Sequence, residues 1–420
     1  MNTPPNTKTD HAWRLKKGMD RRFLSGHPWV YSNELQVSPK GVEKGQRVDL
    51  FNAGGEFIAS GFANPNSLIA FRACDRTRKT ADIETQVWVS EKIKAAEKFR
   101  LYQGMQKASH RLFFAEADGI PGLVIDCYVL ANNQGKVHVI QTQTAGADKL
   151  LPFVLEVFKG STCVVKNSSE MRKLEGLEVE ETRVVGPMKA SELKKVAALV
   201  QAGYQTLTLF CDLIDGQKTG LFLDQRTNIE FAMNRALMMK FTSKNAKILD
   251  LCSYVGQWSA FLAKTLLDRG VMPEITLVDA SEKALGFAKL NVQATGAELV
   301  RTEKLDVLQE LDKLPMNAYD IVICDPPALI SSRKHLPVGK SAYSKLNTQA
   351  FKRVADNGLF VSCSCSGLLG EDDFVELLAK SAHRAEKSPK VLGRGMQSYD
   401  HPALFNFPEG RYLKAWFAQC

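Results

Sequence analysis

The stretch that decides the expected fold reads Lys247-Ile-Leu-Asp-Leu-Cys-Ser-Tyr-Val-Gly256. Its first half is an apolar run typical of a buried strand, and its glycine opens a tight turn into a helix over 258–267. At the carboxyl end of the first strand of an α/β sheet, such a turn lets backbone groups approach a ligand closely. That strand is expected at 248–251, and further buried strands at 275–279, 321–325 and 358–363. From about Gln205 onward the sequence therefore predicts an α/β domain with a parallel, doubly wound sheet.

Three aspartates follow successive strands and point to a ligand. Asp279 comes after the second strand, Asp306 after Glu303-Lys-Leu, and Asp325 after the fourth strand. A carboxylate at the second strand tip can accept hydrogen bonds from ribose hydroxyls, and one at the third can reach an adenine amino group. Each aspartate alone is equally well explained as a helix cap. The ordered set favours a cofactor that contains adenosine.

The same turn argues against a nicotinamide cofactor. The dinucleotide fingerprint G-x-G-x-x-G cradles a pyrophosphate, whereas this turn reads Cys252-Ser-Tyr-Val-Gly256-Gln-Trp. A methyl donor of the S-adenosylmethionine type has no pyrophosphate, so it does not need those glycines. S-adenosylmethionine is therefore the expected cofactor.

Two strand ends carry groups that can do chemistry. Asp325-Pro-Pro327 closes the fourth strand, because proline cannot extend the hydrogen-bond ladder. The next strand ends in Ser362-Cys-Ser-Cys-Ser-Gly367. In a sheet of this type the two strands would be neighbours, so a carboxylate and a thiol would share one pocket.

This pair suits methylation of a cytosine at carbon 5. That carbon is a weak nucleophile, but addition of a thiolate to carbon 6 makes it enamine-like. We expect Cys365 to be the nucleophile, with a depressed thiol pKa, and Asp325 to hold the N3/N4 edge of the base. Two other interpretations remain open: Cys365 as a small buried hydrophobic residue, and Cys363, deeper on the same strand face, as the nucleophile. A metal site is not expected, since no second Cys or His pair has ligand spacing.

Composition limits the class of protein. The 420 residues include 45% hydrophobic and 24% charged residues, as in a folded globular protein. With 55 Lys+Arg against 46 Asp+Glu, the net charge of +9 favours a polyanionic partner such as nucleic acid. The nine cysteines are odd in number and scattered, which is typical of reduced thiols. Residues 1–10 lack a signal-peptide core and no apolar stretch is long enough to span a bilayer, so we expect a cytoplasmic location.

The first half of the chain predicts two smaller modules. Short strands between glycine turns suggest a small β-rich barrel from 11 to 78, with strands at Trp29–Tyr31, Arg47–Phe51, 57–59 and 68–72. A helix over 83–106, helical residues near 150–158, and strands at 122–129, Lys136–Thr142 and 163–166 suggest an α+β module.

The chain resembles the bacterial 23S ribosomal RNA (cytosine-5-)-methyltransferase I family over nearly its whole length. The segments that carry the resemblance are His27-Pro-Trp-Val-Tyr-Ser32, Glu116-Ala-Asp-Gly-Ile-Pro-Gly-Leu-Val-Ile-Asp126, Arg172-Lys-Leu-Glu-Gly-Leu177, Lys218-Thr-Gly-Leu-Phe-Leu-Asp-Gln-Arg226, 249–256, Asp325-Pro-Pro327, Ser364-Cys-Ser-Gly-Leu368 and Pro408-Glu-Gly-Arg-Tyr-Leu-Lys414.

The resemblance implies a fold, a substrate and a partner. It implies an N-terminal PUA domain for RNA (11–82), a central α+β domain (83–195) and a C-terminal Rossmann-like methyltransferase domain (196–420). The implied substrate is 23S ribosomal RNA or a large-subunit assembly intermediate, with no membrane partner, and a homodimer is expected. The family's catalytic cysteine aligns with Cys365.

The resemblance also implies individual site residues. Those aligned with the family's cofactor-binding positions, or with the segment leading into them, are Phe222, Asp224, Gln225, Arg226, Asp250, Ser253, Tyr254, Gly256, Asp279, Asp306 and Asp325. The chain departs from the family at Gln257, where a glycine is usual, and at Cys252, where an aromatic residue is usual. Gln257 is expected to crowd the methionine end of the donor.

The N-terminal module contains basic residues that are expected to bind RNA. Lys16, Lys17, Arg21 and Arg22 cluster near its start and are expected to contact RNA phosphates, with Trp29 or Tyr31 near a base. A solvated basic face over a core tryptophan explains the same residues equally well. Two other functions stay open: methylation of a guanine nitrogen, which needs no cysteine, and a non-catalytic RNA-binding protein of ribosome assembly.

Overall fold

The structure is a computed structural model that describes residues 12–77, 82–241 and 243–420. The segment 1–10, the expected domain start at residue 11, and residues 78–81 lie outside the described residues. The chain divides into two compact units. The first ends at Lys194 and also holds Leu213–Asp215 and Asp400–Gly410, and the second holds Lys195–Asp212, Gly216–Tyr399 and Arg411–Cys420.

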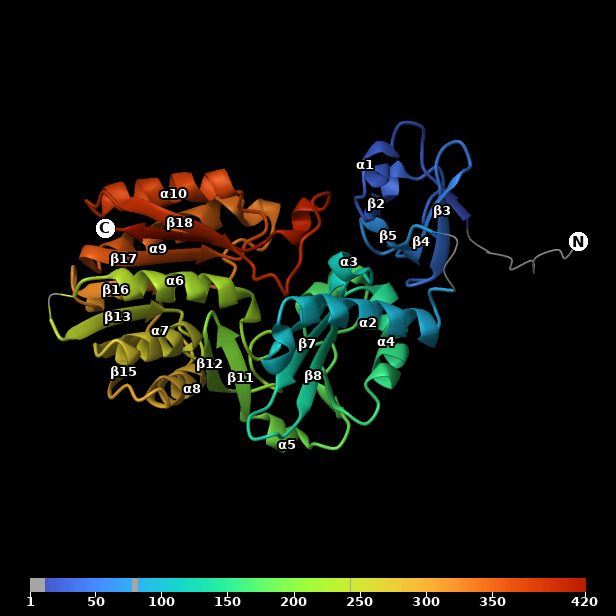
Figure 1. Ribbon diagram of the computed structural model, residues 1–420. Helices are drawn as coiled ribbons and strands as arrows, with labels where there is room; N and C mark the ends of the chain where they lie inside the picture. Colours follow the sequence, from blue (N-terminus) through green and yellow to red (C-terminus); the bar gives the residue numbers. More distant parts are fainter. Residues whose placement is uncertain (1–11, 78–81, 242) are drawn as a thin grey trace, which may run out of the picture. The chain divides into compact units, whose positions relative to one another are not determined.

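The first unit begins with a five-stranded sheet of order β1-β3-β4-β5-β2 (Figure 1). Its elements are β1 (Ala12–Arg14), α1 (Arg21–Leu24), β2 (Trp29–Tyr31), β3 (Arg47–Phe51), β4 (Phe57–Ala63) and β5 (Ile69–Asp75). Strands β2 and β3 have the predicted bounds. The predicted strand at 68–72 begins one residue later, and Leu68 is exposed. Apolar side chains such as Leu50 and Phe71 form the core of this module.

The rest of the first unit is an α+β module with a sheet of order β10-β9-β8-β7-β6. Its elements are α2 (Gln86–Tyr102), β6 (His110–Phe114), α3 (Ala115–Asp118), β7 (Leu123–Val129), β8 (Lys136–Thr142), α4 (Ala145–Val157), β9 (Thr162–Val165), β10 (Arg183–Val185) and α5 (Ala190–Leu193). Thr85 and Thr144 cap α2 and α4 through their side chains, and both helices pack on the apolar face of the sheet. The predicted α+β module is therefore present.

The second unit opens with an antiparallel hairpin, β11 (Val196–Ala202) and β12 (Gln205–Cys211). This corrects the expectation that a β-α-β pattern starts at about Gln205. In β11 buried residues alternate with half-buried ones, the period-two pattern of a strand with one packed face. The chain then enters α6 (Arg226–Met238) and the main sheet.

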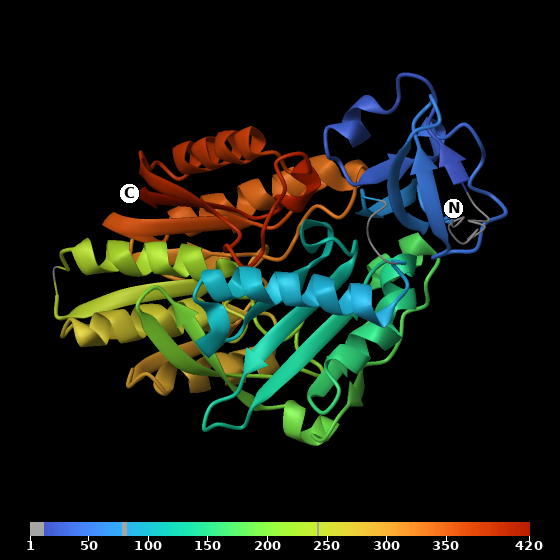
Figure 2. The same ribbon diagram turned by 45° about the vertical axis from the view of Figure 1, so that its right-hand side comes forward.

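The main sheet has seven strands in the order β15-β14-β13-β16-β17-β19-β18 (Figures 1 and 2). Its strands are β13 (Asn245–Leu251), β14 (Met272–Asp279), β15 (Leu299–Lys304), β16 (Tyr319–Cys324), β17 (Val354–Ser364), β18 (Lys390–Met396) and β19 (Lys414–Gln419). Helices α6, α7 (Gln257–Asp268) and α8 (Glu282–Gln293) pack side by side, and α9 (Leu336–Phe351) packs against α10 (Glu371–Arg384). The predicted doubly wound α/β architecture is confirmed.

Two strands depart from the predicted parallel sheet. Strands β13 to β17 are parallel to one another, but β19 runs antiparallel to both β17 and β18. The edge strand β18 has no fully buried residue and contains Gly393 and Gly395, so its sequence carries little apolar periodicity. The pair adds a mixed edge next to the strand that carries the cysteines.

Candidate active site

One cavity of about 540 Å³ lies at the carboxyl ends of the parallel strands of the second unit. The predicted site residues that line it are Phe222, Asp224, Gln225, Ser253, Tyr254, Asp279, Asp306, Asp325 and Cys365. Strands β16 and β17 are neighbours, as predicted, so Asp325 and Cys365 follow adjacent strand tips. The cavity thus brings the expected cofactor carboxylates and the expected catalytic pair together.

The turn after β13 adopts left-handed backbone conformations. The φ angles are +61° at Cys252, +49° at Tyr254 and +74° at Gly256. A Cβ atom at Gly256 would lie 3.0 Å from Ala288, so glycine is needed there for both conformation and space. The backbone N–H of Tyr254 donates to Asp279 Oδ2 at 2.9 Å. The turn and the second strand tip therefore position each other.

Two polar atoms in the cavity wall have no partner among the described residues. They are the buried Ser253 Oγ and Gln257 Oε1. The side-chain N–H of Gln257 donates to the Phe222 carbonyl at 3.2 Å, which fixes the side chain that replaces the usual glycine. Buried polar atoms without a partner are costly, so these two indicate a polar ligand.

Three expected cofactor residues are not part of the cavity wall: Gly256, which forms the turn described above, Arg226 and Asp250. Arg226 is buried at the start of α6. Asp250 is fully buried in β13, where alternation along the strand turns it toward α7, and its Oδ2 accepts from Ser259 Oγ at 2.7 Å. Burial raises the pKa of Asp250 to about 7, and its Oδ1 has no partner among the described residues.

Replacing Asp250 with asparagine is expected to stabilise the protein in a pH-dependent way. Because the folded pKa is raised, the buried carboxyl keeps its proton at pH 4. As the pH rises through about 7 the carboxyl ionises inside the protein, and the free energy of unfolding becomes smaller. The amide oxygen of asparagine can still accept from Ser259. The stability of Asp250→Asn relative to the parent should therefore be about 1–4 kcal/mol greater at pH 8 than at pH 4 in denaturant unfolding.

The exposed Glu282 provides the matched control for this measurement. Glu282→Gln should change stability by nearly the same small amount at both pH values. If Asp250→Asn behaved in the same way, Asp250 would have an ordinary carboxyl pKa in the folded protein.

Asp325 is held by two side chains that sequence reasoning did not select for this role. Gln225 Nε2 and Trp258 Nε1 donate to its Oδ2 at 2.8 and 3.0 Å. Gln225 is in turn fixed by Asn228, whose amide donates to its Oε1 at 2.6 Å. Burial raises the pKa of Asp325 to about 6, so a neutral carboxyl is accessible near physiological pH.

Cys365 and Cys363 differ in access. Cys365 is half-buried and lines the cavity, whereas Cys363 is fully buried inside β17. The expectation of a depressed pKa at Cys365 is wrong, because burial raises the thiol pKa to about 11. Lys218 lowers that pKa, but its effect is smaller than that of burial, while Asp325 and Asp224 raise the pKa further.

Lys414 fixes the position of the loop that follows Cys365. It is buried, and its Nζ donates to the carbonyls of Ser366 and Tyr412, each at 3.0 Å. The hydroxyl of Tyr412 donates to Asp224 Oδ2 at 2.6 Å. The match to Pro408-Glu-Gly-Arg-Tyr-Leu-Lys414 was a signal for these residues, but only the antiparallel pairing of β19 with β17 shows what they contact.

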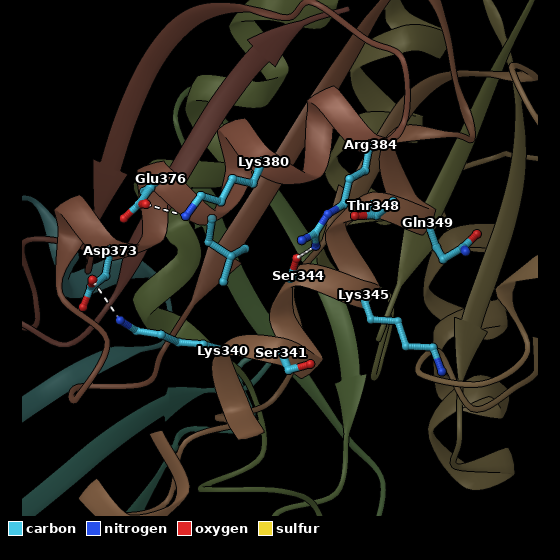
Figure 3. A pocket seen from close by; sticks show the side chains of 11 residues that line it. Lys340, Ser341, Ser344, Lys345, Thr348, Gln349, Asp373, Glu376, Lys380 and Arg384 are labelled. Carbon is cyan, nitrogen blue, oxygen red and sulfur yellow. Dashed lines mark hydrogen bonds and ion pairs between the residues drawn. The ribbon is translucent and has the colours of Figure 1, made fainter. Parts of the chain in front are cut away.

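A second groove lies between α9 and α10 and is not a candidate for the chemistry (Figure 3). Lys340 pairs with Asp373 at 2.8 Å and Lys380 with Glu376 at 2.5 Å, so its carboxylates are neutralised. No cysteine lines it. The described residues contain no group of His, Cys, Asp and Glu side chains arranged to hold a metal ion.

The residues expected to contact RNA are partly engaged within the first unit. Arg22 pairs with Glu34 at 2.9 Å, and Lys16 donates to the Asn33 carbonyl, whereas Lys17 and Arg21 are exposed. Trp29 Nε1 donates to Glu116 at 2.8 Å.

His401 is buried, and its Nδ1 lies 3.0 Å from Asp400 Oδ1. In the described part of the chain, none of the helices has the length and apolar character needed to cross a bilayer.

Comparison with family models and with known proteins supports this arrangement. Residues 14–76 match the PUA-like domain model and residues 221–375 the methyltransferase small domain model. Relatives named ribosomal RNA large subunit methyltransferase I occur in Klebsiella pneumoniae subsp. pneumoniae, with 28% identity over 96% of each chain, and in Escherichia coli O139:H28, with 27% identity over 96% of this chain and 97% of the relative.

Two solved structures share the fold. SMU.776, assigned as a methyltransferase and solved in complex with SAH, superposes with a TM-score of 0.75 at 17% identity, covering 98% of this chain and 100% of that one. A protein from Streptococcus mutans, assigned as a SAM-dependent methyltransferase, gives a TM-score of 0.73 at 16% identity with the same coverage. These comparisons support S-adenosylmethionine as the cofactor. The protein is an α/β protein with an N-terminal PUA-like domain and a C-terminal methyltransferase domain.

Proposed function

We propose that this protein is an S-adenosylmethionine-dependent methyltransferase that forms 5-methylcytosine at a cytosine of 23S ribosomal RNA through a covalent bond to Cys365. The names of the relatives support methylation of large-subunit ribosomal RNA. The observation that carries the finer proposal is that Cys365 and Asp325 line one cavity from adjacent strand tips. A ribosomal RNA substrate implies a cytoplasmic location.

The cavity offers the contacts that the cofactor requires. Asp279 would hold the ribose and Asp306 the adenine amino group, while Ser253 Oγ and Gln257 Oε1 supply acceptors that have no protein partner among the described residues. Phe222 and Tyr254, with ring centroids 5.1 Å apart, add an aromatic wall. When bound, S-adenosylmethionine supplies an electrophilic methyl group on a sulfonium sulfur.

Cys365 and Asp325 have separate roles in the reaction of the cytosine base. The Cys365 thiolate adds through Sγ to carbon 6, and the C5=C6 electron pair shifts toward N3, which takes the proton of the neutral Asp325 carboxyl. Carbon 5 becomes enamine-like and accepts the methyl group. Loss of the carbon-5 proton to a base then expels Cys365 as a thiolate, and N3 returns its proton to Asp325.

The hydrogen bonds of Asp325 suit this role. Gln225 and Trp258 both donate to Oδ2, and no donor among the described residues reaches Oδ1. Oδ1 is therefore free to carry the proton and to face N3, while Oδ2 stays anchored. The raised pKa of Asp325, caused by burial, keeps the protonated form accessible.

Three further assignments belong to this proposal. The domain limits 11–82, 83–195 and 196–420 are kept as functional units. Lys17 and Arg21, both exposed, are proposed to contact RNA phosphates. A homodimer is proposed from the resemblance, and light scattering of the full chain would test it.

The proposal is tested with 23S RNA transcribed with 5-fluorocytidine. Fluorine at carbon 5 cannot leave as a proton, so elimination is blocked and a protein–RNA adduct should accumulate when the methyl donor is present. A denaturing gel measures the adduct. It should form with the parent and with Cys363→Ala, and it should be absent with Cys365→Ala. An adduct that survives in Cys365→Ala, or no adduct with the parent, would contradict the covalent mechanism.

A further inference from the structure

The charges around the cavity oppose formation of a thiolate. Among the described residues that line it, four are aspartates and a single one, Lys218, is a cation. The aspartates are Asp224, Asp279, Asp306 and Asp325. A cysteine that must lose its proton in such surroundings needs a nearby positive charge.

The backbone holds Lys218 in a conformation that lysine rarely adopts. Its φ angle is +47°, in the left-handed region that is unfavourable for residues other than glycine. Strain of this kind persists where the surrounding structure imposes it, and it is common at functional sites. It places the side chain in the cavity wall together with Cys365.

Two contacts orient the ammonium group. Lys218 Nζ lies 3.3 Å from Asp224 Oδ2 and 4.5 Å from the centre of the Phe222 ring. Asp224 is itself held by the Tyr412 hydroxyl. The Tyr412 carbonyl accepts from Lys414, which also donates to Ser366, the residue after Cys365. One chain of contacts therefore links the lysine to the cysteine loop.

We propose that Lys218 is a positioning residue that keeps its ammonium group beside Cys365 and so favours the thiolate that the proposed function requires. In the step it assists, the Cys365 S–H bond breaks, the proton passes to water and the electron pair stays on sulfur. Lys218 keeps its own proton throughout.

Other charged and titratable groups lie near Cys365, but among the described residues none of them is a cation in the cavity wall. Asp325 and Asp224 raise the thiol pKa, whereas Lys218 lowers it. Tyr343 is buried, and its hydroxyl is hydrogen-bonded to the hydroxyls of Ser364 and Ser366. Lys414 also interacts electrostatically with Cys365, but it is buried, its Nζ donates to the carbonyls of Ser366 and Tyr412, and it does not line the cavity. Lys218 therefore has no substitute among the described residues of the cavity wall.

The test compares Lys218→Met with Lys218→Arg in the full chain, without methyl donor and without RNA. The rate at which iodoacetamide alkylates Cys365 is measured by peptide mass spectrometry from pH 7 to pH 9. Alkylation proceeds through the thiolate, so loss of the cation should slow it about 3- to 10-fold at each pH. Lys218→Arg should react at the parent rate. In 1 M salt the difference in rate between the parent and Lys218→Met should become smaller.

Lys345→Met is the matched control, because Lys345 is an exposed lysine of the same unit that lies in the other groove. It should leave the rate unchanged. Lys218→Gln provides a second neutral variant should the methionine variant fold poorly. The proposal is overturned if the neutral variants react at the parent rate, or if Lys218→Arg is as slow as Lys218→Met.

This result is separable from the proposed function. A slow neutral variant together with no 5-fluorocytosine adduct would retain the role of Lys218 and reject cytosine methylation. If the parent forms the adduct but the neutral variant is alkylated at the parent rate, cytosine methylation would be retained and the role of Lys218 rejected.

Discussion

Replacing Cys365 with alanine is expected to lower methyl transfer to cytosine by at least about 10³-fold, roughly 4 kcal/mol of transition-state stabilisation. Among the described residues two cysteines line the cavity: Cys365, at the strand tip next to that of Asp325, and Cys252, in the first turn. Without Cys365 carbon 5 stays a poor nucleophile. Incorporation of a labelled methyl group into 23S RNA, followed by nucleoside analysis, measures the loss.

Cys363→Ala is the matched control for this variant. Cys363 lies two residues before Cys365, inside β17, and is fully buried, so its loss should leave a small cavity and keep turnover within a few-fold of the parent. Cytosine methylation that persists in Cys365→Ala would rule out the covalent mechanism. Methyl incorporation at a guanine nitrogen that does not depend on Cys365 would identify the alternative enzyme class.

Asp325→Asn is expected to lower kcat/KM about 10²- to 10³-fold near pH 6. The asparagine oxygen can still accept from Gln225 and Trp258, but its amide cannot transfer a proton to N3. The shape of the site is therefore retained while proton donation is lost. Methyl transfer under subsaturating RNA measures the effect.

The pH profile of kcat/KM gives this prediction a distinctive form. In the parent, the thiolate fraction rises tenfold per pH unit toward a pKa of about 11, while the protonated fraction of Asp325 falls above a pKa of about 6. Their product rises up to about pH 6 and is then flat. In Asp325→Asn only the thiolate matters, so kcat/KM should keep rising above pH 6 and the deficit should shrink.

Asp306→Asn serves as the control for the pH profile. Asp306 lines the cavity but is exposed, and its Oδ1 accepts from the backbone of Leu308. Its loss should raise the KM for the methyl donor and leave the break near pH 6 in place. A break that persists in Asp325→Asn would assign it to a different group.

Much of the α/β unit follows from local sequence patterns. Buried strands such as β13 and β16 are short apolar runs, and the residue after each run, as at Asp325, must leave the ladder. Parallel strands place their carboxyl ends at one edge, so the meeting of Asp279, Asp306, Asp325 and Cys365 around one cavity could be predicted from strand order alone. Hydrophobic periodicity is a property of neighbouring residues, which is why the sequence suffices for it.

Only the tertiary structure decided the features that depend on distant segments. One such feature is the position of β19 between β17 and β18, and another is the place of Asp400–Gly410 in the first unit. A third is the set of contacts that joins Lys218 through Asp224 to Tyr412. Each of them joins residues that are far apart in the chain. The thiol pKa of Cys365 is raised rather than lowered for the same reason. A pKa depends on burial and on charges in three dimensions, whereas the sequence shows only which residue types are present.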